Sequence, residues 1–155
     1  MNEQIKIIAQ NKRAGYDYFL EDFIECGIEL KGSEIKSLRV NKAIIADAYI
    51  VIRNGEAYVI NMNIPLFKQG GMFNHEPART RKLLLHKKEI YRIETKAAQK
   101  VMTIIPTKLY FKKGRAKLEI ALAKGKKKYD KREVERNKEI SRNIDKAKKD
   151  GVHYQ

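Results

Sequence analysis

The stretch AYIVIRNGEAYVI, residues 48–60, decides the fold class because it encodes a β-hairpin. Two runs rich in β-branched and aromatic residues flank Asn54-Gly55, a pair that accepts the positive φ angles of a type I′ turn. Such a turn joins two neighbouring antiparallel strands. The stretch therefore predicts an antiparallel sheet near the middle of the chain.

A second hairpin is predicted further along the chain. Residues 102–111 and 115–122 are two strand-like segments joined at Lys112-Lys113-Gly114. In the second segment apolar side chains alternate with Lys117 and Glu119, which is the period of a half-buried strand. One face of this hairpin is expected to contribute to the core and the other to lie at the surface.

A third strand is predicted at residues 18–30, before the first hairpin. Its apolar residues occupy the even positions, which predicts one buried face. Asp22 and Phe23 interrupt the alternation and predict a bulge at which the strand bends.

Two helices are predicted around these strands. Gly32-Ser33-Glu34 has the composition of a stop followed by an N-cap, and it starts a short helix with Lys36 and Arg39 on a basic side. Residues 86–100 have helical periodicity and predict a covering helix. Residues 65–81 have no periodicity, and so long a connection in a compact domain is typically functional or mobile.

The spacing of these elements predicts a mainly β protein, a small antiparallel barrel that resembles the oligonucleotide-binding fold and carries short helices. Residues 1–124 are expected to form this β-barrel domain, and residues 125–155 a basic C-terminal tail. The tail has too few large apolar residues to order itself. Because Ile140, Ile144 and Ala147 have helical spacing, the tail is predicted to be a conditional helix that a partner orders.

The composition favours a polyanionic partner. The 155 residues contain 34 Lys and Arg against 19 Asp and Glu, a net charge of +15. A hydrophobic content of 43% is enough for a real core and excludes a wholly disordered basic protein. One cysteine excludes an internal disulfide and indicates a reducing compartment, so we expect a cytoplasmic protein. The chain lacks the apolar stretches of a signal peptide or a membrane helix, so no membrane partner is expected.

Catalytic chemistry finds little support in the sequence. His75-Glu76 is the most enzyme-like pair, but no helical His-Glu-x-x-His motif follows it, and a loop histidine that forms hydrogen bonds or stacks is the favoured interpretation. Cys26 lies on the apolar side of its strand, as a structural thiol does. Phosphate-binding loops and nucleophile motifs are absent. We therefore expect a protein that is not an enzyme, with no catalytic residue, metal site or cofactor.

Basic residues recur beside aromatic ones, a mixture that suits phosphate neutralisation together with base stacking. Each cluster alone is also compatible with an ordinary solvated surface, but several in one short chain favour RNA. The clusters are Lys12-Arg13 before Tyr16, Arg79 and Arg81 after Phe73, Lys112-Lys113 after Tyr110-Phe111, and 126–128 before Tyr129. We expect exposed donors here, so that alanine at Lys117, or at Arg79 and Arg81, weakens RNA binding and spares stability.

Specific strings show a resemblance that covers nearly the whole chain. They are Asn11-Lys12-Arg13-Ala14, Asp17-Tyr18-Phe19, Glu25-x-Gly27-Ile28, the run from Gly32 to Arg39, Asn74-His75-Glu76-Pro77, the run from Arg79 to Leu85, and Gly125-Lys126-Lys127 followed by Tyr129-Asp130-Lys131-Arg132. In this order they resemble the bacterial SsrA-binding proteins, the small protein B family, which are partners of transfer-messenger RNA in ribosome rescue.

The resemblance implies an adaptor of trans-translation rather than an enzyme. Its barrel would bind the tRNA-like domain of transfer-messenger RNA. Its tail would become helical in the decoding centre and the empty mRNA channel of a stalled ribosome, against 16S rRNA. Alanyl-transfer-messenger RNA would then enter the vacant A site with elongation factor Tu.

The resemblance also implies site residues. In the family pattern the RNA-gripping positions resemble Glu25, Leu84 and Lys117, and matching strings and donor chemistry add Asn11, Lys12, Arg13, Arg39, Asn74, His75, Arg79 and Arg81. The tail positions are Gly125, Lys126, Lys127, Tyr129, Asp130, Lys131 and Arg132. The chain departs from the family pattern at Gly15-Tyr16, where a basic residue and a histidine are common.

Two rival functions remain at this point. The alternative is a general single-stranded RNA-binding protein of the oligonucleotide-binding class, although that role does not need the long basic tail. A nuclease would need clustered carboxylates for metal, and the acidic residues scatter along the chain.

Overall fold

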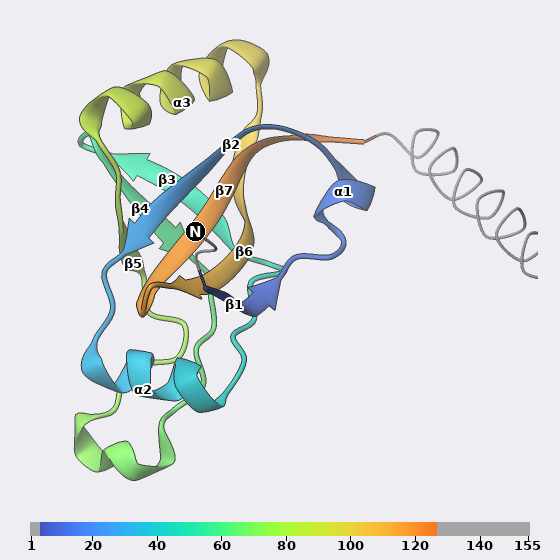
Figure 1. The fold of residues 1–155 in the computed structure, drawn as a ribbon. Helices are drawn as coiled ribbons and strands as arrows, with labels where there is room; N and C mark the ends of the chain where they lie inside the picture. Colours follow the sequence, from blue (N-terminus) through green and yellow to red (C-terminus); the bar gives the residue numbers. More distant parts are fainter. Residues whose placement is uncertain (1–3, 127–155) are drawn as a thin grey trace, which may run out of the picture.

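The computed structural model describes residues 4–126, and its centre is a seven-stranded antiparallel sheet with the strand order β1-β6-β7-β2-β5-β4-β3 (Figure 1). The strands are β1 (Ile5–Gln10), β2 (Tyr18–Ile28), β3 (Tyr49–Arg53), β4 (Glu56–Ile60), β5 (Arg81–Leu84), β6 (Thr103–Lys112) and β7 (Arg115–Gly125). The helices are α1 (Ala14–Asp17), α2 (Gly32–Val40), the 3-10 segment η1 (Lys68–Phe73) and α3 (Lys87–Lys100).

The sheet curls into a small barrel. Its two ends approach each other because β3 packs against β6 without a hydrogen-bonded ladder between them. Helix α3 covers one end of the barrel and α2 lies at the other (Figure 1). The interior is one apolar cluster to which strands and both long helices contribute, including Ile24, Leu38, Ile93, Leu109 and Leu118. The predicted mainly β barrel with short helices is confirmed.

Both predicted hairpins are confirmed, and their turns explain why. Asn54 and Gly55 have φ values of 52° and 75°, and Lys113 and Gly114 have φ values of 53° and 76°. Positive φ at both central residues is the type I′ geometry, whose twist matches that of the flanking strands.

The predicted bulge in β2 is confirmed and changes which cluster its residues join. Asp22 has a φ of 55°, and the register with β7 shifts between Glu21 and Ile24. One extra residue reverses the alternation of side chains along a strand. Ile24 therefore joins the main core, whereas Tyr18 and Leu20 pack on a separate small cluster. The expectation of a single buried face for all even positions is wrong.

Helix α3 is confirmed, and the start of α2 needs a correction. Helix α2 begins at Gly32 with Lys31 as its cap, not with Ser33. Glu34 accepts a hydrogen bond from the Lys31 N–H at 2.7 Å, which satisfies a backbone donor of the first turn. Ser33 instead contacts His75, as described below.

Candidate nucleic-acid interface

Three of the residues that carry the sequence hypothesis meet in one row across the sheet. Gly27 of β2 is opposite Lys117 of β7 on one side and opposite Leu84 of β5 on the other. Tyr110 of β6 continues the row beyond Lys117. Residues in register on adjacent strands share a face. The sheet therefore places a cation and an apolar side chain on either side of a glycine.

Gly27 is needed in this row because Leu84 lies close over it. A Cβ atom at position 27 would be 3.2 Å from the Leu84 Cβ and 3.3 Å from its Cδ1, which is tighter than ordinary contact. Leu84 remains 53% exposed, an unusual state for a leucine in a strand. A glycine inside a strand often marks such a close approach, and this signal was present in the sequence.

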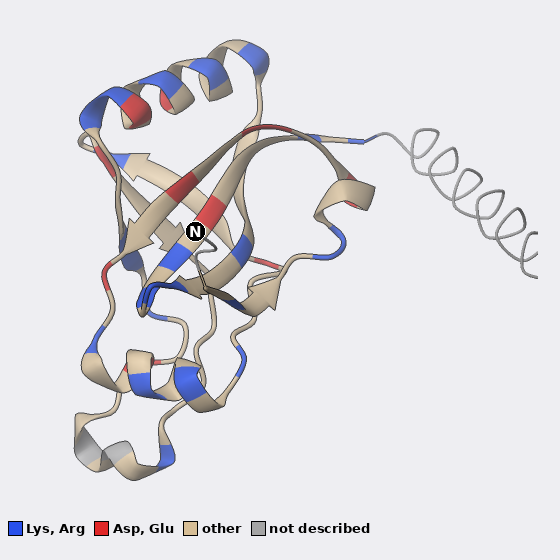
Figure 2. Ribbon diagram, in the orientation of Figure 1, with Lys and Arg blue, Asp and Glu red and all other residues tan. Residues whose placement is uncertain are grey.

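Gly27, Leu84 and Lys117 of this row line a groove of about 410 Å³. Helix α2 contributes Ile35 to its wall, and the turn between β6 and β7 contributes Gly114 and Arg115. Figure 2 shows basic residues on α2 and at this turn. The groove thus combines apolar surface with cations at its edges, the mixture that suits an RNA backbone and its bases.

Glu25 lies two residues before Gly27 on β2, next to the row. Its neighbours explain how a carboxylate is accommodated at this basic surface. The Tyr110 hydroxyl donates a hydrogen bond to its Oε2, and the Lys112 Nζ is 3.4 Å from the same atom. The Tyr110 hydrogen bond lowers the pKa of Glu25, burial opposes this shift, and Lys112 adds to it. Glu25 is thus an ionised acceptor whose orientation is set by its neighbours. Tyr110 and Lys112 belong to one of the basic and aromatic clusters of the sequence but were not among the predicted site residues.

A second group of predicted residues is internal rather than exposed. Glu34 of α2 is fully buried, and its carboxylate pairs with Arg79 at 2.5 Å and with Arg81 through the other oxygen. Burial raises the pKa of Glu34, but hydrogen bonds from Arg79, the Lys31 N–H and Arg81 outweigh this effect and lower the pKa overall. The ion pair with Arg81 connects α2 to β5, and the ion pair with Arg79 connects α2 to the loop that precedes β5.

The expectation of an exposed side chain is wrong for Arg81. Arg81 is 0% exposed, and besides Glu34 it donates to the Met62 carbonyl at 2.6 Å and the Pro77 carbonyl at 2.9 Å. His75 is 3% exposed. All of these contacts are internal, because the carbonyls of an irregular segment need buried donors.

His75 and Asn74 organise the loop that precedes β5. The ring of His75 is 2.9 Å from the Ser33 Oγ through Nδ1 and 2.9 Å from the Ile64 carbonyl through Nε2. Asn74 bonds the backbone of Phe67 in both directions. These hydrogen bonds fix the conformation of the loop. For His75 they agree with the hydrogen-bonding histidine that the sequence favoured.

The other predicted barrel residues lie apart from the groove. Lys12, Arg13 and Arg39 are exposed, and Asn11 lines a separate cavity. Arg13 is 3.7 Å from Asp17 and lies over the Tyr16 ring at 5.1 Å from its centroid. The structure therefore brings Glu25, Leu84 and Lys117 together and leaves the N-terminal cluster as a second surface.

The base of the predicted tail is attached to the barrel. Gly125, the first residue of the predicted tail, is the last residue of β7 and pairs with Tyr18. Lys126 donates from its backbone to the Asp17 carbonyl at 2.9 Å and from Nζ to the Gly15 carbonyl at 2.8 Å. Lys127, Tyr129, Asp130, Lys131 and Arg132 lie outside the described residues.

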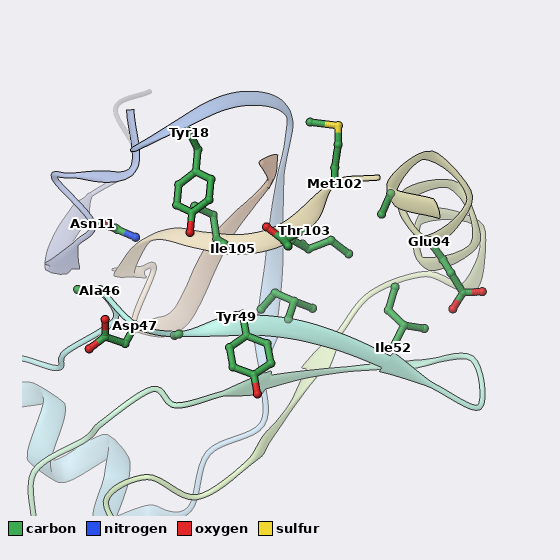
Figure 3. A pocket seen from close by; sticks show the side chains of 14 residues that line it. Asn11, Tyr18, Ala46, Asp47, Tyr49, Ile52, Glu94, Met102, Thr103 and Ile105 are labelled. Atoms are coloured by element: carbon green, nitrogen blue, oxygen red, sulfur yellow. The ribbon is translucent and has the colours of Figure 1, made fainter. Parts of the chain in front are cut away.

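A cavity of about 640 Å³ opens where β3 and β6 face each other (Figure 3). Tyr18, Tyr49 and Met102 line it together with the carboxylates of Asp47 and Glu94. None of its lining residues within the described chain is Lys or Arg. Carboxylates without cations repel phosphate, so the charge of this cavity suits RNA less well than that of the groove.

Among residues 4–126 no three side chains that ligate metals lie close enough to hold an ion. Cys26 is buried and donates to the Leu118 carbonyl at 3.1 Å. Burial raises the pKa of Cys26 to about 12, which keeps the thiol protonated. In the same part of the chain, no helix has the length and apolar character needed to cross a bilayer.

The small barrel, its groove and the cationic surplus define the class of nucleic-acid-binding β-barrels. The chain belongs to the SmpB protein family, whose model matches residues 8–150. It is 50% identical over 149 residues to the SsrA-binding protein of Lysinibacillus sphaericus, covering 96% of each chain. It is 52% identical over 141 residues to the SsrA-binding protein of Thermosipho melanesiensis, covering 90% of this chain and 96% of that protein.

A solved structure gives the same result for the fold. A chain from the structure described as "tmRNA-SmpB: a journey to the center of the bacterial ribosome" superposes with a TM-score of 0.66. The two chains are 40% identical, and the match covers 83% of this chain and 94% of that one.

Proposed function

We propose that this protein is an RNA-binding adaptor of trans-translation that holds the tRNA-like domain of transfer-messenger RNA and delivers it to stalled ribosomes. The observation that carries the proposal is the row Lys117-Gly27-Leu84, on the barrel of a chain that belongs to the SmpB family. The relatives are named SsrA-binding proteins, and the structural neighbour is described as tmRNA-SmpB on the bacterial ribosome.

In this proposal the groove binds RNA without performing chemistry on it. Lys117 neutralises a phosphate, and Leu84 gives an apolar contact to a sugar or a base. Glu25 accepts from a base amino group or a 2′-hydroxyl, because its orientation is already set by Tyr110 and Lys112. The exposed cations Lys12, Arg13 and Arg39 add phosphate contacts from outside the groove.

The second part of the proposal concerns the ribosome. The string from Gly125 to Arg132 and the basic residues beyond it would occupy the decoding centre and the empty mRNA channel, against 16S rRNA. The RNA would arrive as alanyl-transfer-messenger RNA with elongation factor Tu. Delivery to the ribosome takes place in the cytoplasm, where ribosomes translate and the single cysteine stays reduced.

A competition experiment tests the proposed partner. Labelled tRNA-like domain is bound to the full chain and displaced either by the same unlabelled RNA or by an unstructured strand of equal length. We expect the folded RNA to compete far better. Equal competition by the unstructured strand would instead support a general single-stranded RNA-binding protein.

Replacing Lys117 by alanine is expected to weaken binding of the tRNA-like domain about tenfold, because one charge-assisted phosphate contact is lost. Log K should fall with log salt by about 0.7–0.9 per phosphate contact, and the variant's slope should be smaller by about 1. The midpoint of urea unfolding should change little.

The matched control is Lys88→Ala on the exposed side of α3. It removes the same charge at the opposite end of the barrel. If Lys88→Ala weakens binding as much as Lys117→Ala, net charge rather than the groove determines affinity.

A further inference from the structure

The loop from Phe67 to Asn74 is closed at its base and holds an aromatic side chain in solvent. The Asn74 side chain donates to the Phe67 carbonyl at 2.5 Å and accepts from the Phe67 N–H at 3.1 Å. Gly71, with a φ of 56°, allows the sharp bend inside the loop. The loop is thereby a defined structure and not a loose connection.

Phe73 is 86% exposed, among the most exposed large apolar side chains of residues 4–126. It lines a pocket of about 420 Å³ with Phe67 and Gln69 of the loop and with Lys36 of α2. An exposed phenyl ring contributes little to folding, and at the rim of a pocket it offers a flat apolar face to a ligand.

The charges around this pocket are those that attract a phosphate. Lys36 lines the pocket, and Lys68 and Arg39 are further exposed cations of the loop and of α2. The acidic residue of α2, Glu34, is fully buried and neutralised by Arg79 and Arg81. Charge complementarity therefore favours an anionic ligand over an apolar peptide segment.

Helix α2 connects this pocket to the groove. Ile35 lines the groove that contains Lys117 and Leu84, and the next residue, Lys36, lines the pocket beside Phe73. A strand of RNA that leaves the groove and crosses the basic side of α2 meets the Phe73 ring next.

We propose that Phe73 is a stacking platform for an unpaired nucleobase of the RNA held in the groove, with Lys36 on the adjoining phosphate. This inference rests on the proposed function and extends its RNA surface across α2. Every base has a π face, so the platform selects an unstacked nucleotide rather than a sequence. The buried network of Glu34, Arg81 and His75 positions the platform by fixing α2 and the loop to each other.

The absence of tryptophan from the chain allows a direct test. Phe73→Trp introduces the sole indole, and Tyr91→Trp, on the opposite helix α3 where Tyr91 is 73% exposed, is the matched control. On titration with the tRNA-like domain we expect quenching of the indole at position 73 that saturates together with RNA binding. The indole at position 91 should stay bright.

Affinity gives a second readout from the full-length chain. Phe73→Ala should raise the Kd for the tRNA-like domain about 5- to 150-fold, the range for the loss of one base–aromatic stack. Phe73→Trp should retain binding, and Tyr91→Ala should have no effect. Circular dichroism of Phe73→Ala should match the parent protein because the ring is solvent-exposed.

The outcomes separate the two proposals. If labelled RNA binds the Phe73→Trp protein with full affinity while its fluorescence does not change, the platform is overturned and the adaptor role stands. Unchanged affinity of Phe73→Ala overturns the platform as well. If the parent protein fails to bind the tRNA-like domain at all, both the proposed function and this inference fail.

Discussion

Replacing Arg81 by alanine is expected to lower the free energy of unfolding by about 3–5 kcal/mol, because a fully buried ion pair loses one partner and Glu34 keeps only the half-buried Arg79. Arg81 and Glu34 are both fully buried. The variant would also remove the donors to the Met62 and Pro77 carbonyls. Urea unfolding measured by circular dichroism checks this value. Arg39→Ala, on the exposed side of α2, is the control and should change stability by less than about 0.5 kcal/mol.

The charge pair itself is isolated by a double-mutant cycle with Glu34→Gln and Arg81→Gln. The double variant should be less destabilised than the sum of the two single variants, because neither Glu34 nor Arg81 is left as a buried charge without the other. Additive effects would show that the two side chains do not interact. A stable Arg81→Ala protein that has lost RNA binding would restore the original expectation that Arg81 contacts RNA.

The same pair predicts the response to acid. The folded-state pKa of Glu34 lies below its ordinary value, so its stabilising contribution is fully present above that ordinary value and is lost as the pH falls through the lowered folded pKa. In Glu34→Gln this part of the acid sensitivity should disappear. Unfolding midpoints measured between neutral and acidic pH check this, and an unchanged pH profile would contradict it.

The second large effect is expected from a chain that ends at Lys127. It retains all of β7 and the Lys126 contacts to the Gly15 and Asp17 carbonyls. It should bind the tRNA-like domain within about threefold of the full chain, since every residue that lines the groove is retained. It should nevertheless fail to support peptidyl transfer to transfer-messenger RNA on ribosomes stalled without an A-site codon.

Point variants sharpen this experiment. Tyr129→Ala removes an aromatic ring, and Asp130→Ala with Arg132→Ala removes one acidic and one basic side chain, so each should reduce rescue and spare the Kd. The control is Lys146→Ala with Lys148→Ala, which changes charge further along the tail. If the control impairs rescue equally, a uniform charge effect explains the tail. If the truncated chain rescues at the full rate, the two-part mechanism is wrong.

Local sequence was sufficient for the elements whose hydrogen bonds and side-chain pattern are local. Asn54-Gly55 and Lys113-Gly114 can adopt positive φ, so both hairpins follow from the turn residues. Helix α3 follows from its period. The resemblance predicted that Glu25, Leu84 and Lys117 share one site. The strand register brings Leu84 and Lys117 beside Gly27.

Tertiary structure decided whether the short strands form and which of their side chains are buried. Strands β1 and β5 were not predicted from the sequence. Strand β5 has only four residues, too few for a clear pattern, and it forms by pairing with β2 and β4. Within β5, Arg81 and Leu83 are buried and Leu84 is exposed. Local pattern ranks arginine as exposed and leucine as buried.

The physical reason for the reversal at β5 is that the surroundings of a side chain are supplied by distant segments. Glu34 of α2 neutralises Arg81, the carbonyls of Met62 and Pro77 accept its remaining donors, and Gly27 leaves room for Leu84 at the surface. Arg79 and Arg81 have the same chemistry in the sequence. The sequence by itself determined the class of fold and the basic, RNA-binding character of the chain. Only the packing of α2 on β5 decided that Arg81 is the fully buried arginine that pairs with Glu34.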